Sequence, residues 1–328
     1  MRILIALGGN AILRRGEPLT VANQIVNIRR AAVQLARIAP GNQLVITHGN
    51  GPQVGLLALQ AAAAGGQDGG TPLDVLDAES EGMIGYLLEQ ELANALPPGR
   101  PVATLLTRVE VHADDPAFAH PTKPIGPVYT KSEAERLAVI NHWTIAPDGT
   151  GYRRVVASPE PQRISELMPI RWLVDLDTIV IAAGGGGVPV SVTADGKTST
   201  GVEAVIDKDR CSALLAADVD ADMLIIATDV DAVYLDWHTP RERALGEISA
   251  TELRTMAFPV GSMGPKVEAA CAFVSKTGRP AVIGSLNRIG EMVNGTAGTR
   301  VMAGKPTGTP PRRDGRCGTQ PCRPPRPL

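Results

Sequence analysis

Apolar and polar positions recur along this chain in a pattern that predicts alternating strands and helices. Residues 21–38 carry apolar side chains every three or four positions, at Val21, Ile25, Ile28, Ala32, Leu35 and Ile38. This spacing predicts a helix with one buried face. Thr20 fits its N-cap and Pro40-Gly41 its end. Continuous apolar runs at 3–7 and 43–47 predict strands before and after it.

The alternation continues through most of the chain. Further helices are predicted near 53–64, 74–95, 203–217 and 264–277, and further strands near 101–107, 174–183, 222–228 and 280–285. Strands that alternate with helices join into parallel sheets through right-handed crossovers. Aromatic residues make up only 3% of the chain, so its core consists of Ala, Val, Leu and Ile, as in a helix-covered parallel sheet. The pattern predicts an α/β fold.

Residues 108–170 interrupt this rhythm. The segment holds eight prolines: Pro116, Pro121, Pro124, Pro127, Pro147, Pro159, Pro161 and Pro169. One helical stretch, 131–141, lies inside it, and no strand with a sheet-like pattern is evident. A long segment without strands of its own is typical of a functional insertion or flap.

Four apolar runs end in turns rich in glycine or acidic residues. The turns are Gly8-Gly9-Asn10, Thr47-His48-Gly49-Asn50-Gly51-Pro52, Gly184 to Gly187, and Thr228-Asp229-Val230-Asp231. Glycine allows close approach of the backbone to a ligand, and successive N–H groups at a turn bind anions. Several such turns at the carboxyl ends of strands predict one crevice for a charged small molecule. Phosphates, carboxylates and dinucleotides all remain compatible with it.

Two common nucleotide motifs are absent. Gly196-Lys197-Thr198 ends like a phosphate-binding P-loop, but Ser191 occupies the position of the required upstream glycine. The glycine run at 184–187 does not continue as a dinucleotide fingerprint, because residue 189 is proline. Neither a P-loop ATPase nor a standard dinucleotide fold is supported.

Three lysines stand in contexts that suit an anion. Lys208 opens a predicted helix, and Lys266 follows Pro265, which fits a first helical residue. Helix N-termini favour anions through their N–H groups and dipole. Lys123 lies in a stiff, proline-rich loop of the insertion. The alternative for each is an ordinary solvated lysine, which the flanking Gly, Pro and Asp residues disfavour for Lys208 and Lys266.

Charge and composition exclude several classes of function. The net charge of −2 gives no basic field for nucleic acid, and no apolar run is long enough to span a membrane. The N-terminus reads as a strand and not as a secretory signal, so a cytoplasmic location is expected. Residues 303–328 contain seven Pro and six Lys or Arg, which predicts a disordered tail. Without this tail the net charge is −7.

The four cysteines indicate neither a disulfide framework nor a metal site. Cys211 and Cys271 lie in apolar, helix-like contexts and are expected to be buried thiols. Cys317 and Cys322 lie in the tail without the further ligands that zinc requires. We expect no protein-held metal.

Here the sequence resembles the carbamate kinase branch of the amino-acid kinase family. The resemblance runs in order through nearly all of residues 1–302. It is carried by Ala6 to Ala11, His48 to Gly55, Glu81 to Tyr86, Pro121 to Pro127, Tyr152 to Val156, Gly184 to Pro189, Gly201 to Asp209, Thr228 to Asp231, and Gly261 to Glu268. No single segment is decisive, but the ordered set is specific.

The resemblance implies a three-layer α/β/α sandwich with an open, mainly parallel sheet. It implies one kinase domain over 1–302, with a carbamate lobe at about 1–175, a protruding subdomain at about 120–158 and a nucleotide lobe at about 176–302. The implied reaction is ATP plus carbamate giving ADP plus carbamoyl phosphate, reversibly, with Mg²⁺. A homodimer and a place in arginine metabolism are implied as well.

Site residues carry over from the same resemblance. The phosphate-contacting lysines fall on Lys123, Lys208 and Lys266, and the organising aspartate on Asp209. The carbamoyl side is expected to use backbone N–H groups of Gly8, Gly9, Asn10, Gly49, Asn50 and Gly51. The nucleotide side is expected to use Gly185, Gly186, Asp229, Tyr234, Met263 and Lys266. Phosphate oxygens would hold Mg²⁺, so no acidic cage is needed.

Some residues leave alternatives open. Asp229 also fits an acid that caps a turn, and His48 is interpreted as a turn residue. Glu81 stands where the family pattern has Gln, which suggests an altered contact in the substrate lobe or dimer. Another kinase of the same fold, acting on a carboxylate or phosphonate, and a non-catalytic nucleotide sensor remain alternative functions.

Overall fold

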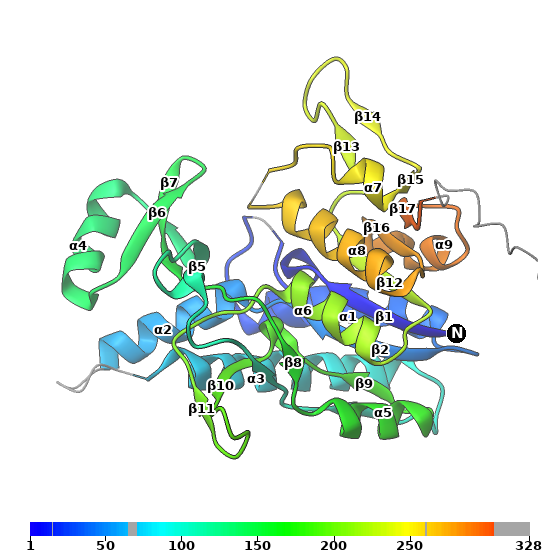
Figure 1. Ribbon diagram of the computed structural model, residues 1–328, viewed down its shortest axis with the longest axis horizontal. Helices are drawn as coiled ribbons and strands as arrows, with labels where there is room; N and C mark the ends of the chain where they lie inside the picture. Colours follow the sequence, from blue (N-terminus) through cyan, green and yellow to red (C-terminus); the bar gives the residue numbers. More distant parts are fainter. Residues whose placement is uncertain (15, 65–70, 260, 305–328) are drawn as a thin grey trace, which may run out of the picture.

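An eight-stranded sheet forms the centre of the molecule (Figure 1). The computed structural model describes residues 1–14, 16–64, 71–259 and 261–304. Only β16 and β17 pair in antiparallel fashion; all other neighbours in this sheet are parallel. In spatial order its strands are β15 (Glu247–Ser249), β17 (Thr299–Met302), β16 (Ala281–Ser285), β12 (Met223–Thr228), β1 (Arg2–Leu7), β2 (Gln43–His48), β9 (Ile179–Ile181) and β3 (Val102–Thr104).

Helices cover both faces of this sheet. Successive side chains of β1 point to opposite faces, as strand geometry requires: Leu4 and Ala6 enter one core and Ile3, Ile5 and Leu7 the other. One face carries α1 (Val21–Ile38), α3 (Leu73–Ala95) and α9 (Ile289–Val293). The other carries α5 (Leu167–Asp175), α6 (Lys208–Asp218), α7 (Ala250–Leu253) and α8 (Met263–Thr277). The predicted three-layer α/β/α sandwich is confirmed.

The predicted insertion contains strands, so the expectation of a strand-free segment was wrong. Strands β5 (Lys123–Tyr129), β7 (Gly151–Val156) and β6 (Thr144–Asp148) form a separate sheet in that order, with α4 (Lys131–Asn141) beside it. The prolines that obscured the pattern, Pro124, Pro127 and Pro147, lie in β5 and β6. Both are edge strands of this sheet, where a missing N–H donor is tolerated. The sheet projects from the body (Figure 1).

A smaller sheet lies beside α3. It consists of β11 (Ser199–Gly201), β10 (Val188–Val192), β4 (Arg108–Glu110) and β8 (Arg163–Ile164). Strands β13 (Tyr234–Leu235) and β14 (Arg243–Ala244) make a hairpin, and α2 (Gly51–Ala64) packs against β5. The predicted strand at 101–107 is shorter in the structure: only Val102–Thr104 form a strand there, β3 of the central sheet, and β4 begins after it, at Arg108.

Several predicted boundaries shift. Residues 174–178 complete α5 and a turn, so only 179–181 form a strand there. Helix α6 begins at Lys208 and not near 203, because Asp207 caps it. Pro265 is the third residue of α8 and not the first. The N-cap Thr20 and the buried Cys211 and Cys271 are as predicted, whereas Cys317, Cys322 and residues 305–328 lie outside the described part. Across the described residues, no helix is both long and apolar enough to cross a membrane.

Candidate active site

Helix α6 begins at the carboxyl end of the central strands, where its first turn presents charged side chains. Asp207 caps the helix: its Oδ1 accepts the N–H groups of Asp209 at 2.9 Å and Arg210 at 3.2 Å. This cap fixes the backbone of Lys208 and Asp209, the first two residues of the helix. The sequence therefore builds the site on a helix terminus of defined geometry.

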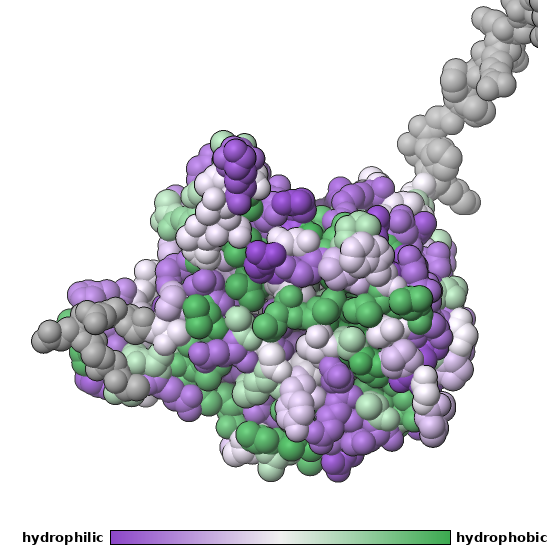
Figure 2. Space-filling view, turned by 90° about the horizontal axis from the view of Figure 1, so that it is seen from below, coloured by the Kyte–Doolittle hydropathy of each residue, from purple (hydrophilic) through white to green (hydrophobic). Residues whose placement is uncertain are grey.

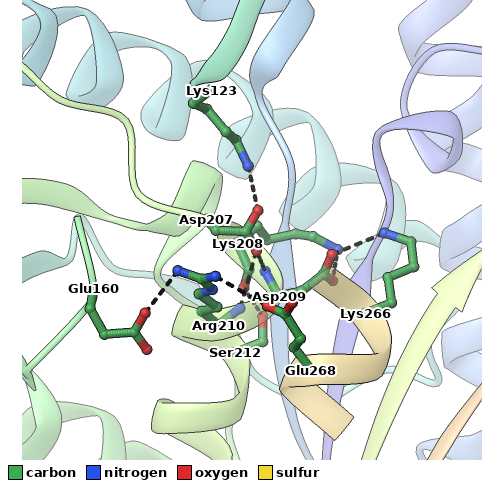
Figure 3. A network of polar contacts seen from close by, with 9 residues as sticks. All are labelled: Lys123, Glu160, Asp207, Lys208, Asp209, Arg210, Ser212, Lys266 and Glu268. Atoms are coloured by element: carbon green, nitrogen blue, oxygen red, sulfur yellow. Dashed lines mark hydrogen bonds and ion pairs between the residues drawn. The ribbon is translucent and has the colours of Figure 1, made fainter. Parts of the chain in front are cut away.

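Asp209 lies between two lysines (Figure 3). Its Oδ1 is 2.8 Å from Nζ of Lys208, and its Oδ2 accepts a hydrogen bond from Nζ of Lys266 at 2.9 Å. The Asp209 side chain is 6% exposed, and those of Lys208 and Lys266 are 10% and 16% exposed. Apart from this ion pair, Nζ of Lys208 has no hydrogen-bond partner among the described residues, so it keeps N–H donors for a ligand.

The ionisation of these groups follows from burial and from each other's charge. Burial alone would raise the pKa of Asp209, but the two neighbouring ammonium groups hold it well below its usual range. Burial acts to lower the pKa of Lys266, yet Asp209 outweighs it and the pKa is raised. For Lys208 burial prevails, and its pKa is lowered despite Asp209. The site thus holds a fixed carboxylate and a poorly solvated ammonium that an anion would stabilise.

Lys123 reaches the same cluster from the projecting sheet. It is the first residue of β5, and its Nζ lies 2.5 Å from Oδ2 of Asp207. Figure 3 shows Lys123 above Asp207 and Lys266 to the right of Asp209. The structure therefore brings together all three predicted lysines and Asp209, from β5, α6 and α8.

The two N-terminal glycine turns meet beside Lys208. A Cβ added to Gly49 would lie 3.5 Å from the N atom of Gly9 and 3.9 Å from Cδ of Lys208. Two of the predicted N–H donors are engaged elsewhere: Gly8 donates to Ala227 at 2.9 Å and Gly49 to Leu7 at 3.2 Å. These two amides close the strand ends through hydrogen bonds within the protein.

Three of the remaining members lie in the first turn of a helix. Gly9 and Asn10 lie in the 3₁₀ helix Gly9–Ala11, and Gly51 is the first residue of α2. Initial N–H groups of a helix have no partner within it and suit an anion. The side chain of Asn10 lies outside the described part. That of Asn50 is buried and donates to Asp77 at 2.9 Å and Ser80 at 2.8 Å, so it ties the turn to α3.

Glu81 binds the backbone of the third glycine turn, Gly184 to Gly187, from the buried side. The two carboxyl oxygens of Glu81 accept the N–H groups of Gly184 at 2.8 Å and Thr107 at 3.2 Å. Burial raises the pKa of Glu81 to about 8, although these hydrogen bonds oppose the shift. Glu81 therefore fixes the backbone of Gly184 and Thr107 from within the protein.

Gly185 and Gly186 are buried and do not line the cavity described below. At Gly185 an added Cβ would lie 2.2 Å from Nδ2 of Asn50, and at Gly186 it would lie 2.5 Å from the carbonyl oxygen of Ile206. Both residues have positive φ, so glycine is needed for conformation and for space. Their predicted contact with a nucleotide stays a prediction.

His48 is not a turn residue, contrary to the expectation. It is the last residue of β2 and is fully buried, with Nε2 directed at Gly184. Burial lowers its pKa to about 4, so the imidazole is neutral at physiological pH. It packs against the glycine turn and carries no charge to the site.

A cavity of about 500 Å³ opens beside Lys266. Its lining includes four of the residues predicted for the nucleotide: Asp229, Tyr234, Met263 and Lys266. Gly8 and Gly9 form the wall shared with the glycine turns. Aromatic side chains of Tyr234, Trp237 and Phe258 also line the cavity, which suits a flat, apolar base beside a charged phosphate chain.

Comparison with known proteins shows to which family this chain belongs. The model of the amino acid kinase family matches residues 1–285. A carbamate kinase of Haemophilus influenzae is 59% identical over 302 residues, covering 92% of this chain and 96% of its own. A carbamate kinase of Escherichia coli strain K12 is 52% identical over 297 residues, covering 90% and 98%. The chain belongs to the carbamate kinases of the amino acid kinase family.

Solved structures agree with this assignment. The carbamate kinase of Giardia lamblia bound to AMP-PNP superposes with a TM-score of 0.83 at 39% identity, covering 92% of this chain and 98% of that one. A UMP kinase of Ureaplasma parvum, at 14% identity and a TM-score of 0.53, shares the fold alone. As a member of the carbamate kinase family, this chain is a kinase, that is, a phosphotransferase.

The site residues predicted from the sequence of this carbamate kinase family member leave out several residues of the cavity, among them Arg153, Trp237 and Phe258. Arg153 of β7 reaches it from the projecting sheet, and Trp237 and Phe258 line it from the hairpin region and the segment before α8. Arg153 lies in the segment Tyr152 to Val156 that carried the family resemblance, which was a usable signal. Trp237 and Phe258 lie outside every quoted motif, so only the fold reveals them.

Proposed function

We propose that this chain transfers a phosphoryl group reversibly between ATP and carbamate, giving ADP and carbamoyl phosphate. The observation that carries the proposal is the Lys208–Asp209–Lys266 cluster, which lies between the N-terminal glycine turns and the aromatic-lined cavity. Carbamate kinases at 52–59% identity over about nine-tenths of the chain support the choice of substrate.

The chemistry needs few groups. A carbamate oxygen attacks the γ-phosphorus, and the bond from that phosphorus to the β–γ bridging oxygen breaks, so ADP leaves. Carbamate is already an anion, so no general base is required. Catalysis then depends on alignment and on neutralising oxygens that gain charge. We assign this neutralisation to Lys208 and Lys266, held by Asp209, and to Lys123 from the projecting sheet.

The glycine turns and the cavity divide the substrates between them. We place carbamate and the transferred phosphoryl group at the N–H groups of Gly9, Asn10, Asn50 and Gly51. We place the nucleotide base in the cavity near Tyr234 and Met263, with Asp229 at its edge. A solved relative that binds AMP-PNP supports nucleotide binding.

The donor set of this chain limits how Mg²⁺ would be held. Within the described residues, no group of three His, Cys, Asp or Glu side chains could hold a metal ion. Both oxygens of Asp209 face lysines. We therefore propose that the phosphate oxygens of the nucleotide provide most Mg²⁺ ligands, which agrees with the usual habit of this ion. Bound there, Mg²⁺ would neutralise phosphate charge.

A coupled assay tests the function directly. The full chain is mixed with ADP, Mg²⁺ and carbamoyl phosphate, and ATP is measured through a hexokinase-linked reaction. Acetyl phosphate in place of carbamoyl phosphate serves as the control substrate. We expect ATP only with carbamoyl phosphate. ATP formation with acetyl phosphate alone would instead support another carboxylate kinase, and ADP binding by calorimetry without any ATP would support a sensor.

We also propose a homodimer, formed around the β3 edge of the central sheet, where α3 flanks one face of the sheet and α5 the other. Strand β3 leaves one edge of the central sheet unpaired among the described residues. Tyr86, Leu106, Met168, Trp172 and Leu176 are large apolar side chains at least half exposed. Figure 2 shows hydrophobic residues spread across the face seen from below, where α3 and α5 lie in Figure 1. Exposed apolar surface of this kind favours association.

The oligomer is tested by light scattering coupled to size exclusion. We expect the wild type to have the mass of a dimer and Trp172→Glu to shift towards a monomer. Val139→Glu, an equally drastic change on exposed α4, is the matched control and should remain dimeric. Monomeric wild type, or a dimer insensitive to Trp172→Glu, would contradict this interface.

The domain division and the cellular setting remain proposals of the same kind. We propose that residues 120–158, which include the projecting sheet, move over the site as a subdomain. The two lobes share the central sheet, because β9 lies between β2 and β3 although its residues follow the proposed boundary near 175. We further propose a cytoplasmic enzyme of arginine metabolism, testable by fractionation and by metabolite analysis of a deletion strain.

A further inference from the structure

The ion pair of Lys123 with Asp207 joins the projecting sheet to the active-site helix. The two residues are 84 positions apart, and their charged atoms are 2.5 Å apart. The Lys123 side chain is 28% exposed and that of Asp207 is 14% exposed. The pair is therefore accessible to a ligand from the side of Lys123.

The two carboxylate oxygens of Asp207 have separate partners. Oδ1 accepts the N–H groups of Asp209 and Arg210 and so caps α6. Oδ2 accepts the ammonium of Lys123. Because the cap depends on Oδ1 alone, Lys123 can leave Asp207 without breaking any hydrogen bond that shapes the start of α6.

Charge in the cluster favours such an exchange. Lys123, Lys208 and Lys266 carry three positive charges, and Asp207 and Asp209 carry two negative charges. Burial acts to raise the pKa of Asp207, but the charge and hydrogen bond of Lys123 keep it below its usual value, so Asp207 stays ionised at neutral pH. A phosphoryl group brings more negative charge than one carboxylate and competes with Asp207 for Lys123.

We infer that Asp207 is a positioning residue that holds Lys123 at the edge of the site until a phosphoryl oxygen replaces it. This inference rests on the proposed function, in which Lys123 contacts the transferred phosphoryl group. A purely structural role for Asp207, as the cap of α6 alone, predicts no energetic coupling to Lys123. The two roles are separable because Asn caps helices about as well as Asp but has no charge.

The experiment is a double-mutant cycle on the full chain with Asp207→Asn, Lys123→Met and the double variant. We expect Asp207→Asn to lower the KM for carbamoyl phosphate about 5-fold, because the competing carboxylate is gone, while the melting temperature changes little. In the Lys123→Met background the same change should alter KM less than about 2-fold. Lys123→Met alone should lower kcat.

Hydrogen exchange of the ligand-free protein gives a second, activity-independent readout. Each of the three variants removes the same ion pair, so amides of β5 should exchange faster, by a similar factor, in all three. Glu133→Gln is the matched control, because Glu133 pairs with Arg136 inside α4 and leaves Lys123 untouched. It should change neither the KM nor the exchange of β5.

Two results would overturn the inference. One is an equal change in KM in both backgrounds, which would show that Asp207 acts through its general field and not through Lys123. The other is unchanged exchange of β5 in Asp207→Asn. Failure of the wild type to form ATP from ADP and carbamoyl phosphate would contradict the proposed function instead, and the exchange experiment would still decide whether Asp207 holds Lys123.

Discussion

Lys266 on α8 and Asp209 on α6 form a 2.9 Å ion pair that joins two helices across 57 positions of sequence. The other oxygen of Asp209 faces Lys208, its neighbour in sequence. One buried carboxylate thus fixes the separation of two ammonium groups. In phosphoryl transfer this separation matters because the charge that develops is spread over several oxygens.

Asp209→Asn should disable catalysis by removing the charge between the two lysines. Lys208 and Lys266 would then repel each other, so we expect kcat to fall about 10²-fold or more. Stability should fall too, because two buried ammonium groups lose their partner. The coupled assay and a thermal melt measure both effects. Asp218→Asn is the control: Asp218 pairs with Lys276 between the same helices but away from the site. Similar kcat losses in both variants would contradict this role.

Lys208→Ala and Lys266→Ala test whether these two lysines neutralise the charge that develops on the phosphate oxygens. Each should lower kcat by about 10²–10³-fold, the scale for losing one preorganised group that stabilises transition-state charge. Far-ultraviolet circular dichroism should show that both variants remain folded. Lys276→Ala removes a half-exposed lysine from the same helix as Lys266 and should leave kcat near the wild-type value. Turnover like the wild type in both site variants would refute the assignment of these lysines.

The parts of the site that sequence could predict are those that depend on local rules. Glycine turns after apolar runs, and lysines beside Asp or Pro at helix starts, follow from backbone geometry within a few residues. Contacts between residues that are far apart in the sequence do not follow from such local rules. Nothing near Asp209 in sequence shows that Lys266 lies opposite it, and nothing near Gly8 shows that its N–H closes onto Ala227. The family resemblance supplied the order of the segments, and the fold supplied the distances.

The projecting sheet shows why a local pattern misled. Prolines weaken the sequence pattern of a strand wherever they occur. Their cost in stability depends on whether the strand lies at the edge of a sheet, where the missing N–H donor is not needed. In the order β5–β7–β6 only β7 has neighbours on both sides, and it contains no proline. Sheet order is a tertiary property, so the sequence of Pro124, Pro127 and Pro147 predicted a loop where edge strands form.

Gly55→Ala should separate the projecting sheet from α2. A Cβ at Gly55 would lie 2.0 Å from both Cα and N of Gly126 in β5, so the backbone must move. We expect a loss of about 1–3 kcal/mol in stability and a higher KM for carbamoyl phosphate, because Lys123 belongs to the same strand. Urea unfolding and the coupled assay measure these changes.

Gly82→Ala is the matched control for that substitution. Gly82 lies inside α3, and its added Cβ would meet only Cδ2 of Leu106, at an ordinary 3.8 Å. Alanine is a better helix former than glycine by about 1 kcal/mol, so this variant should be as stable as the wild type or more so. If Gly55→Ala also gained stability, close packing of α2 on β5 would be wrong.

Glu81 should make stability depend on pH in a defined direction. Its pKa rises from 4.5 to about 8 on folding, chiefly through burial. Between these values the folded protein keeps a proton that the unfolded chain releases. The contribution of Glu81 is therefore complete below about pH 4.5 and is lost as pH rises towards 8, at up to about 1.4 kcal/mol per pH unit.

The difference in unfolding free energy between the wild type and Glu81→Gln isolates this effect. We expect it to fall steadily from pH 5 to pH 8 in urea titrations, since glutamine does not ionise. His48 acts in the opposite direction, because burial lowers its pKa to about 4, but it is present in both proteins and cancels. Exposed Glu79 on the same helix provides the matched control Glu79→Gln, which makes the same substitution at a solvated position. A Glu81→Gln difference that is flat or rises with pH would mean that Glu81 is ionised in the folded protein and that its two backbone hydrogen bonds outweigh its burial.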